Sequence, residues 1–114
     1  TSKNKFNKIK YFEANIYQNQ NKYLLIKNSK FKFLNNLLIF PMKEVEKNKF
    51  NISLNKKINI KMSNMDMKII LNKKNKLIKI KNSYLVDKKN IKDLILPSFT
   101  KKIFNSVSNY LWKK

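Results

Sequence analysis

Lysine is the one abundant side chain in this sequence that can take part in chemistry. The 114 residues include 27 basic residues, all of them lysine, and six carboxylates, so the formal net charge is +21 at pH 7. At this density, repulsion between like charges opposes a compact fold, and binding to a polyanion relieves that repulsion. We therefore expect a nucleic acid to be the partner of this protein.

The other residue types offer little for catalysis. The sequence has no histidine, cysteine or glycine, so it provides no imidazole base, no thiolate, no common zinc site and no glycine-rich phosphate loop. The closest pair of carboxylates, Glu44 and Glu46, lies among lysines, where a solvated surface is a simpler interpretation than a cation site. We predict a protein that is not an enzyme and that uses no cofactor, metal or small-molecule substrate.

Several lysines stand in pairs where strands or helices are expected to end, or between the apolar residues of expected strands. There the ammonium group can neutralise a backbone phosphate, and each such contact adds about 0.7 to 0.9 to the salt dependence of binding. Because lysine lacks the planar fork of arginine, we expect recognition of shape more than of base sequence. For any single position, a solvated lysine is the alternative. The lysines predicted to contact RNA are Lys3, Lys5, Lys8, Lys10, Lys56, Lys57, Lys61, Lys73, Lys74, Lys101, Lys102, Lys113 and Lys114.

The stretch 50–82 is expected to position many of these lysines. It alternates apolar and polar residues in four short runs, which are separated by gaps rich in asparagine and lysine. A period of two predicts strands with one wet and one buried face, and the short gaps favour an antiparallel meander. Asparagine is expected to take the place of glycine in the turns because it tolerates positive φ.

Two helices are predicted to cover the apolar face of this meander. The first spans about 87–96 with Asp87 as its N-cap, and the second spans 98–112, where apolar residues recur at intervals of three and four. The expected fold is therefore a small α+β domain at 41–114, in which an antiparallel meander packs against one or two helices.

Residues 1–40 are predicted to form a basic N-terminal extension that carries aromatic residues. It either lies along RNA, with lysines on phosphates and rings on bases, or packs its rings on a neighbouring protein. Within it, the apolar run Phe31–Phe40 fits a strand or a short helix equally well, and Pro41 ends either one.

Four segments between residues 40 and 114 match the pattern of one protein family: Phe40–Val45, Ile58–Met67, Leu77–Ile80 and Thr100–Val107. Lys61, Asp66 and Met67 fall where the family has Lys, Glu and Leu. The last segment places Thr100, Lys101, Ile103 and Asn105 where the family has Thr, Arg, Leu and Asn. On these segments the chain resembles the first domain of ribosomal protein six of the large subunit.

The chain also departs from that family. Met62 and Met65 replace the two glycines of its loop. The first forty residues of this sequence have no counterpart in the family, and the family's usual second domain has no counterpart in this sequence. The resemblance therefore implies a divergent, reduced or split ribosomal protein, which contacts rRNA and neighbouring ribosomal proteins.

The favoured residue types, Lys, Asn, Ile, Leu and Phe, have AT-rich codons and indicate an AT-rich genome such as that of an organelle. We therefore expect a structural constituent of the large subunit of an organellar ribosome, mitochondrial first and plastid second. The alternative is a basic peripheral subunit of an organellar inner-membrane complex, with Phe31–Phe40 as an interfacial anchor. A free RNA-processing or DNA-binding factor is a third possibility. No apolar run approaches the roughly 18 residues of a spanning helix, so no transmembrane segment is predicted.

Overall fold

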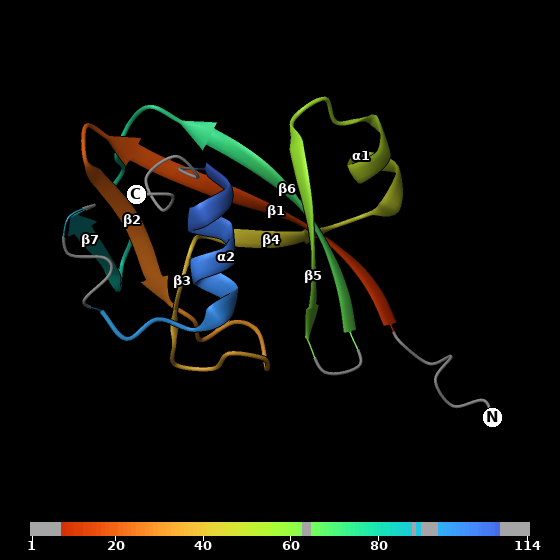
Figure 1. Cartoon of the computed structure of the whole chain (residues 1–114), viewed down its shortest axis with the longest axis horizontal. Coiled ribbons are helices and arrows are strands. Elements are labelled where there is room, and N and C mark those ends of the chain that lie inside the picture. Colours follow the sequence, from red (N-terminus) through yellow and green to blue (C-terminus); the bar gives the residue numbers. More distant parts are fainter. Residues whose placement is uncertain (1–7, 63–64, 88, 90–93, 108–114) are drawn as a thin grey trace. The chain divides into compact units, whose positions relative to one another are not determined.

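The computed structural model describes residues 8–62, 65–87, 89 and 94–107, and shows an α+β fold in which strands predominate (Figure 1). The predicted fold class is therefore confirmed. The hydrogen-bonded strand order is β3-β2-β1-β6-β5, with β4 also paired to β1 and β7 also paired to β2. The elements described are β1 (Lys8–Asn19), β2 (Lys22–Lys27), β3 (Leu38–Ile39), β4 (Met42–Val45), α1 (Lys47–Ile52), β5 (Lys56–Met62), β6 (Met65–Lys74), β7 (Ser83–Asp87) and α2 (Ser98–Val107).

The chain divides into two compact units, and strand β1 contributes residues to both. The first unit consists of the residues up to Ala14 together with Met42–Asn72. The second consists of Asn15–Pro41 together with the residues from Lys73 onward.

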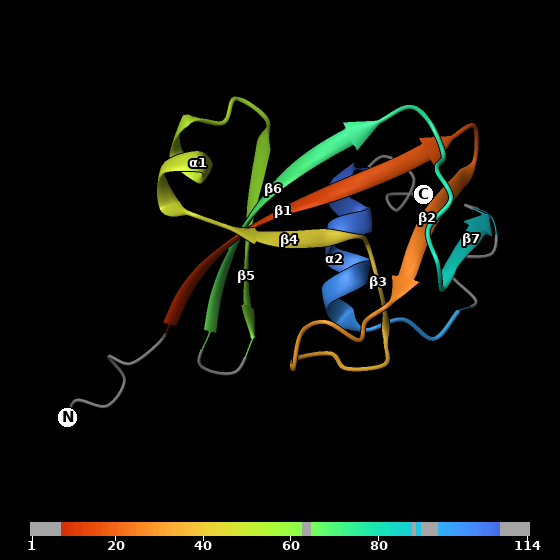
Figure 2. The same ribbon diagram turned by 180° about the vertical axis from the view of Figure 1, so that it is seen from behind.

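The first unit is built from two antiparallel pairs with one buried face, and the other face is exposed over much of β5 and again buried at Ile70 of β6. β1 pairs with β4, and β5 pairs with β6 over the full length from Lys56↔Leu71 to Met62↔Met65. Figure 2 shows β5 and β6 as a hairpin, with α1 between β4 and β5 along the chain. The buried face contains Phe12, Ala14, Ile60, Met67 and Ile69. The prediction of a hairpin in this part of the meander is confirmed.

The first run of the predicted meander is not a strand. Phe50 and Ile52 lie in α1, where the N–H of Phe50 donates to the carbonyl oxygen of Glu46 at 3.1 Å. The Phe50 ring packs against the ring of Tyr11 with centroids 5.1 Å apart, whereas Ile52 and Leu54 are exposed. The alternation of apolar and polar residues is misleading here, because of the three apolar residues only Phe50 packs against the sheet.

The second unit is organised around β2, which is buried on both faces. β2 pairs with β1, β3 and β7, and its Tyr23, Leu24 and Leu25 are all buried. Helix α2 covers one face, where the Phe104 ring meets the Tyr23 ring edge-on with centroids 4.7 Å apart. The predicted helix at 98–112 is confirmed as far as Val107, and its remainder lies outside the described residues.

The prediction of an extension over residues 1–40 is wrong for the part that the structure describes. Residues 8–19 and 22–27 are strands of the sheet, and Phe12, Ala14 and Ile16 occupy alternate, fully buried positions. The lysines around Phe12 obscured this period because their side chains can stay in water while the backbone joins the sheet.

Two further predictions for the C-terminal half need correction. The fourth meander run, Ile78–Ile80, is irregular backbone and not a strand. Asp87 is the last residue of β7, so it does not cap a helix. Half of the predicted helix at 87–96 lies outside the described residues, and its described part, 94–96, is not helical.

Of the run Phe31–Phe40, for which a strand or a short helix was predicted, only Leu38–Ile39 is a strand, β3. The segment 28–37 forms a loop that leads into β3. The loop closes on the side chain of Asn28, of which only 1% is exposed. The side-chain amide donates to the carbonyl oxygens of Phe31, Phe33 and Leu34 at 3.3, 2.6 and 3.0 Å, and the Asn28 Oδ1 accepts from the N–H groups of Lys30 and Phe31. One buried side chain thus satisfies the polar backbone of a loop that has no glycine.

We predict that Asn28→Ala lowers the free energy of unfolding by about 2 to 4 kcal/mol, because buried backbone groups lose their partners. Urea denaturation followed by circular dichroism measures this. Asn35→Ala, in the exposed part of the same loop, should change it by less than about 0.5 kcal/mol. Equal effects of the two substitutions would contradict the role of Asn28.

Positive φ angles bear out the expected use of asparagine only in part. Asn36 and Asn82 have φ of 66° and 62°, but Gln20 and Leu34 also adopt positive φ. The pairing Asn19↔Lys22 leaves a two-residue hairpin loop in which Gln20 comes first, the position that glycine fills in a type II′ turn.

Gln20→Gly is therefore predicted to raise the free energy of unfolding by about 0.5 to 1 kcal/mol, because glycine removes the steric cost of positive φ. The same urea titration tests it. Asn21→Gly should not stabilise the protein, since Asn21 does not have positive φ. A destabilised Gln20→Gly variant would refute the assignment of the turn.

Candidate nucleic-acid interface

The wet face of the β5–β6 hairpin gathers lysines in a fixed register. Lys57, Asn59 and Lys61 alternate along β5, and the register places Lys68 opposite Asn59 and Asp66 opposite Lys61. Lys57 and Lys61 stand about 13 Å apart on the same face, since they are four strand residues apart. We name Lys57, Lys61 and Lys68 the hairpin lysines.

Hydrogen bonds on this face occupy its one carboxylate. Asn59 donates from its side-chain amide to Asp66 Oδ1 at 3.2 Å, and Lys68 Nζ donates to Asn59 Oδ1 at 3.3 Å. Lys61, although directly opposite Asp66, forms no ion pair within the described part of the chain. Lys57 Nζ lies 5.1 Å from the centre of the Phe50 ring, a contact that leaves its charge uncompensated by any acid.

Two other carboxylates of the first unit, Glu13 and Glu44, pair with lysines away from the hairpin. Glu13, whose side chain is 13% exposed, lies 3.9 Å from Lys43 Nζ and 3.4 Å from Lys49 Nζ. Asn72 also donates to its Oε2 at 3.1 Å, so this carboxylate links α1, β4 and β6 to β1. Lys10 pairs with Glu44 at 3.6 Å. The first unit thus separates lysines that are paired from hairpin lysines that are not.

The predicted RNA-contacting lysines divide between the two units. Lys8, Lys10, Lys56, Lys57 and Lys61 belong to the first unit, whereas Lys73, Lys74, Lys101 and Lys102 belong to the second. Lys3, Lys5, Lys113 and Lys114 lie outside the described residues.

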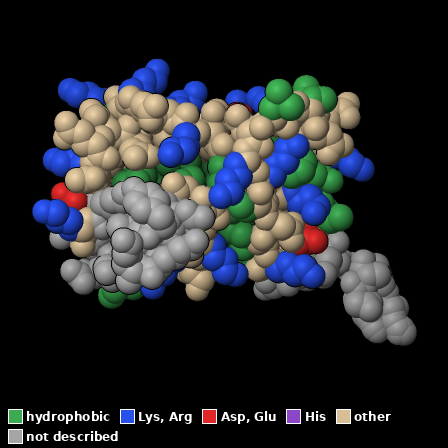
Figure 3. Space-filling view, turned by 45° about the horizontal axis from the view of Figure 1, so that its top comes forward, with side chains coloured by type: hydrophobic (Ala, Val, Ile, Leu, Met, Phe, Trp, Pro, Cys, Tyr) green, Lys and Arg blue, Asp and Glu red, His purple; other side chains and the backbone are tan. Residues whose placement is uncertain are grey.

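The two units present their predicted lysines differently. Lys101 and Lys102 are exposed on α2, on the side away from the buried Phe99 and Phe104. Lys10 is half-buried and already paired, which makes it the weakest of the predicted contacts. Figure 3 shows lysine side chains spread across the face in view, with few carboxylates among them.

Lys68 was missed by the sequence reasoning. It lies inside a strand, between the buried Met67 and Ile69, as Lys61 lies between Ile60 and Met62, yet it was not among the lysines predicted to contact RNA. The hairpin register identifies it, because pairing Ile60 with Met67 necessarily sets Lys68 beside Asn59.

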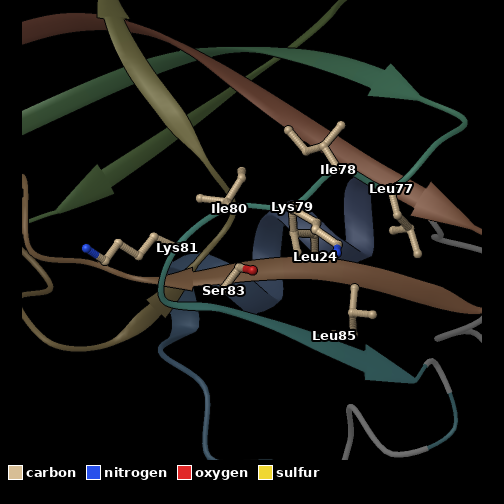
Figure 4. Close-up of a pocket in the computed structure, with 8 residues that line it drawn as sticks. All are labelled: Leu24, Leu77, Ile78, Lys79, Ile80, Lys81, Ser83 and Leu85. Carbon is tan, nitrogen blue, oxygen red and sulfur yellow. The ribbon is translucent and has the colours of Figure 1, made fainter.

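The second unit contains a concave surface feature that is mainly apolar. It has a volume of about 700 Å³ and lies between β2, β7 and the segment 77–81 (Figure 4). Its lining residues are Leu24, Leu77, Ile78, Lys79, Ile80, Lys81, Ser83 and Leu85. We call it the β7 groove.

Neither a metal centre nor a spanning helix is found in the part of the chain that the structure describes. No three His, Cys, Asp or Glu side chains cluster there as a metal site requires. Likewise, none of the described helices has the length and apolar character needed to cross a membrane.

Replacing the three hairpin lysines together by glutamine should weaken RNA binding and lower the slope of log K against log salt by about 2 to 3, because three phosphate contacts are lost. Fluorescence anisotropy with a labelled RNA stem-loop at several salt concentrations measures both quantities.

The matched control carries Lys27→Gln, Lys32→Gln and Lys76→Gln, three exposed positions of the second unit. It has the same net charge as the hairpin variant. If both variants lose the same affinity and slope, binding is a property of total charge, and the hairpin is not the interface.

Comparison with known proteins gives a fold but no family. No protein-family model matches the chain, and no curated protein matches it. Among solved structures, 37 chains are similar. One belongs to the crystal structure of the complex between the C-terminal domain of mouse MUTYH and human PCNA, with a TM-score of 0.62 over 89% of this chain and 88% of that chain. At 9% identity, this likeness shows a shared fold alone.

Proposed function

We propose that this protein is a structural constituent of the large subunit of an organellar ribosome, where its lysines bind rRNA phosphates. The observation that carries the proposal is the set of hairpin lysines, which share one face and form no ion pair among the described residues. A surface of this kind fits the regular negative charge of a nucleic-acid backbone.

The overall charge supports a permanent partner of this kind. The chain of 114 residues carries a formal net charge of +21, and none of the described lysines is buried. The three ion pairs found among the described residues involve Lys10, Lys43 and Lys49 only. Surface pairs of this kind contribute about 0 to 1 kcal/mol each, so they do not offset the repulsion. A bound polyanion does.

The resemblance to ribosomal protein six of the large subunit is part of the proposal. Its segments Ile58–Met67 and Thr100–Val107 fall on the β5–β6 hairpin and on α2, a strand pair and a helix as the resemblance implies. Leu77–Ile80, which the resemblance makes a strand, is irregular. The organellar location rests on the AT-rich codons of the favoured residue types, with the mitochondrion as the first candidate.

The membrane alternative requires the rings of Phe31–Phe40 to be available to lipid. Phe31 and Phe33 instead stack on each other with centroids 5.0 Å apart, and Phe33 also contacts Phe99 of α2 at 6.5 Å. Phe40 is fully buried. These contacts engage the rings of the run within the second unit, which favours the ribosomal proposal over an interfacial anchor.

Sedimentation of organelle lysate through a sucrose gradient with magnesium tests the proposal. We expect the protein to migrate with the large ribosomal subunit and to be released by high salt, because its contacts are phosphate neutralisations. A protein of the organellar inner membrane and a protein of the small ribosomal subunit serve as markers for the other fractions. Recovery only in the membrane pellet would support the alternative, and recovery only at the top of the gradient would contradict both.

A further inference from the structure

Strand β7 ends the second unit's sheet with one paired edge and one open edge. β7 pairs with β2 from Lys22↔Asp87 to Ile26↔Ser83, and no other strand among the described residues pairs with it. An open edge presents a row of backbone donors and acceptors that another chain can use.

The register determines which backbone groups face that open edge. The N–H of Lys27 donates to the carbonyl oxygen of Asn82, which continues the register by one pair. Hydrogen-bonded and non-bonded pairs alternate in an antiparallel ladder, so Leu25↔Tyr84 is a bonded pair and Leu24↔Leu85 is not. The N–H and C=O of Leu85 and the N–H of Asp87 therefore point away from β2.

β7 lacks the protection that the other strands carry. Every other described strand of four or more residues contains at least one lysine, whereas β7, Ser83–Asp87, contains none. Lysines on edge strands discourage pairing with other chains. In β7, Tyr84 and Leu85 are instead 48% and 53% exposed. In a chain with 27 lysines, a lysine-free edge with two exposed apolar residues is a distinct surface.

The β7 groove lies beside this open edge. Leu85 is opposite Leu24 and therefore shares its face of the sheet, the face on which the segment 77–81 forms the other wall. Figure 4 shows Leu85 on β7 and Leu77 and Ile78 on the segment around the same hollow. Among the described residues that line it, Lys79 and Lys81 are the charged ones.

We propose that an extended, acidic polypeptide segment adds to β7 as a further strand. Its backbone would pair with the outward N–H and C=O of Leu85, and the residue opposite Leu85 would direct its side chain to the face of the groove. An apolar side chain fits that position, and acidic side chains two residues before and after it, which lie on the same face of the strand, fit Lys79 and Lys81. A second copy of this chain is disfavoured, because bringing together two bodies of charge +21 opposes association.

The groove is built from the second unit alone, so this inference stands apart from RNA binding by the hairpin of the first unit. The hairpin-lysine variant described above should therefore bind an acidic strand as well as the unaltered protein does.

The test uses the full chain and a fluorescein-labelled Glu-Glu-Val-Val-Glu-Glu peptide, each face of which carries a valine between two glutamates when the peptide is extended. A second peptide has the same sequence but carries N-methyl groups on every second residue along one edge, so it keeps its charge and cannot form a ladder. We expect at least tenfold weaker binding of the methylated peptide in fluorescence anisotropy at physiological salt. Equal binding of the two peptides would show that attraction between charges is sufficient, and would overturn the proposal.

A pair of variants locates the site. Leu85→Lys introduces the missing edge lysine and should weaken the unmethylated peptide at least fivefold, despite adding a positive charge. Ile95→Lys adds the same charge at a fully exposed residue of the same unit and should leave binding unchanged or slightly stronger. Equal behaviour of the two variants would overturn the proposal.

Amide hydrogen exchange provides a readout that does not depend on either variant. Peptide binding should slow exchange at Leu85 and Asp87 and leave the amides of β5 unchanged. Protection at Leu85 that rises with protein concentration in the absence of peptide would identify a second copy as the occupant. It would refute the acidic segment.

Discussion

The constraint on which this structure depends is that its many lysines must stay in water while apolar residues of the same strands form the core. A core is obtained only where apolar residues occupy alternate positions, as Phe12, Ala14 and Ile16 do along β1. Lysines that lie between apolar residues, as Lys61 lies between Ile60 and Met62 on β5, keep their ammonium groups in solvent, and their charges accumulate on the outside. The same alternation that builds the sheet therefore also builds the cationic surface.

Asparagine takes structural roles that glycine in turns and carboxylates on surfaces have in other proteins. Asn28 closes the loop before β3 with its side chain, and Asn36 and Asn82 adopt positive φ in turns. On the sheet, Asn59 holds Asp66 and Asn72 supports Glu13. Because the amide is neutral and both donates and accepts, it can organise a surface crowded with lysines without adding to their repulsion.

Two of the described edge strands, β5 and β7, differ in how their edges are protected. β5 carries Lys56, Lys57 and Lys61 along its length, a pattern that resists pairing with other chains and offers charge to a polyanion. β7 carries no lysine and exposes Tyr84 and Leu85 beside an apolar groove. The lysines of β5 suit a polyanion, and the lysine-free edge of β7 suits an extended polypeptide.

The sequence by itself determined the α+β class, the hairpin at 56–74, the start of the helix at Ser98 and the excess of lysine, because these follow from local period and composition. Only the tertiary structure decided that β1 and β2 belong to the sheet, that Phe50 lies in a helix and that Lys68 joins Lys57 and Lys61. Strand pairing between distant segments, such as β2 with β7, sets which residues share a face. A period of two shows only that successive residues point to opposite faces of a strand, whereas the partner strand determines which residue lies beside each of them. For that reason, neither the hairpin face nor the open edge of β7 could be recognised before the register was known.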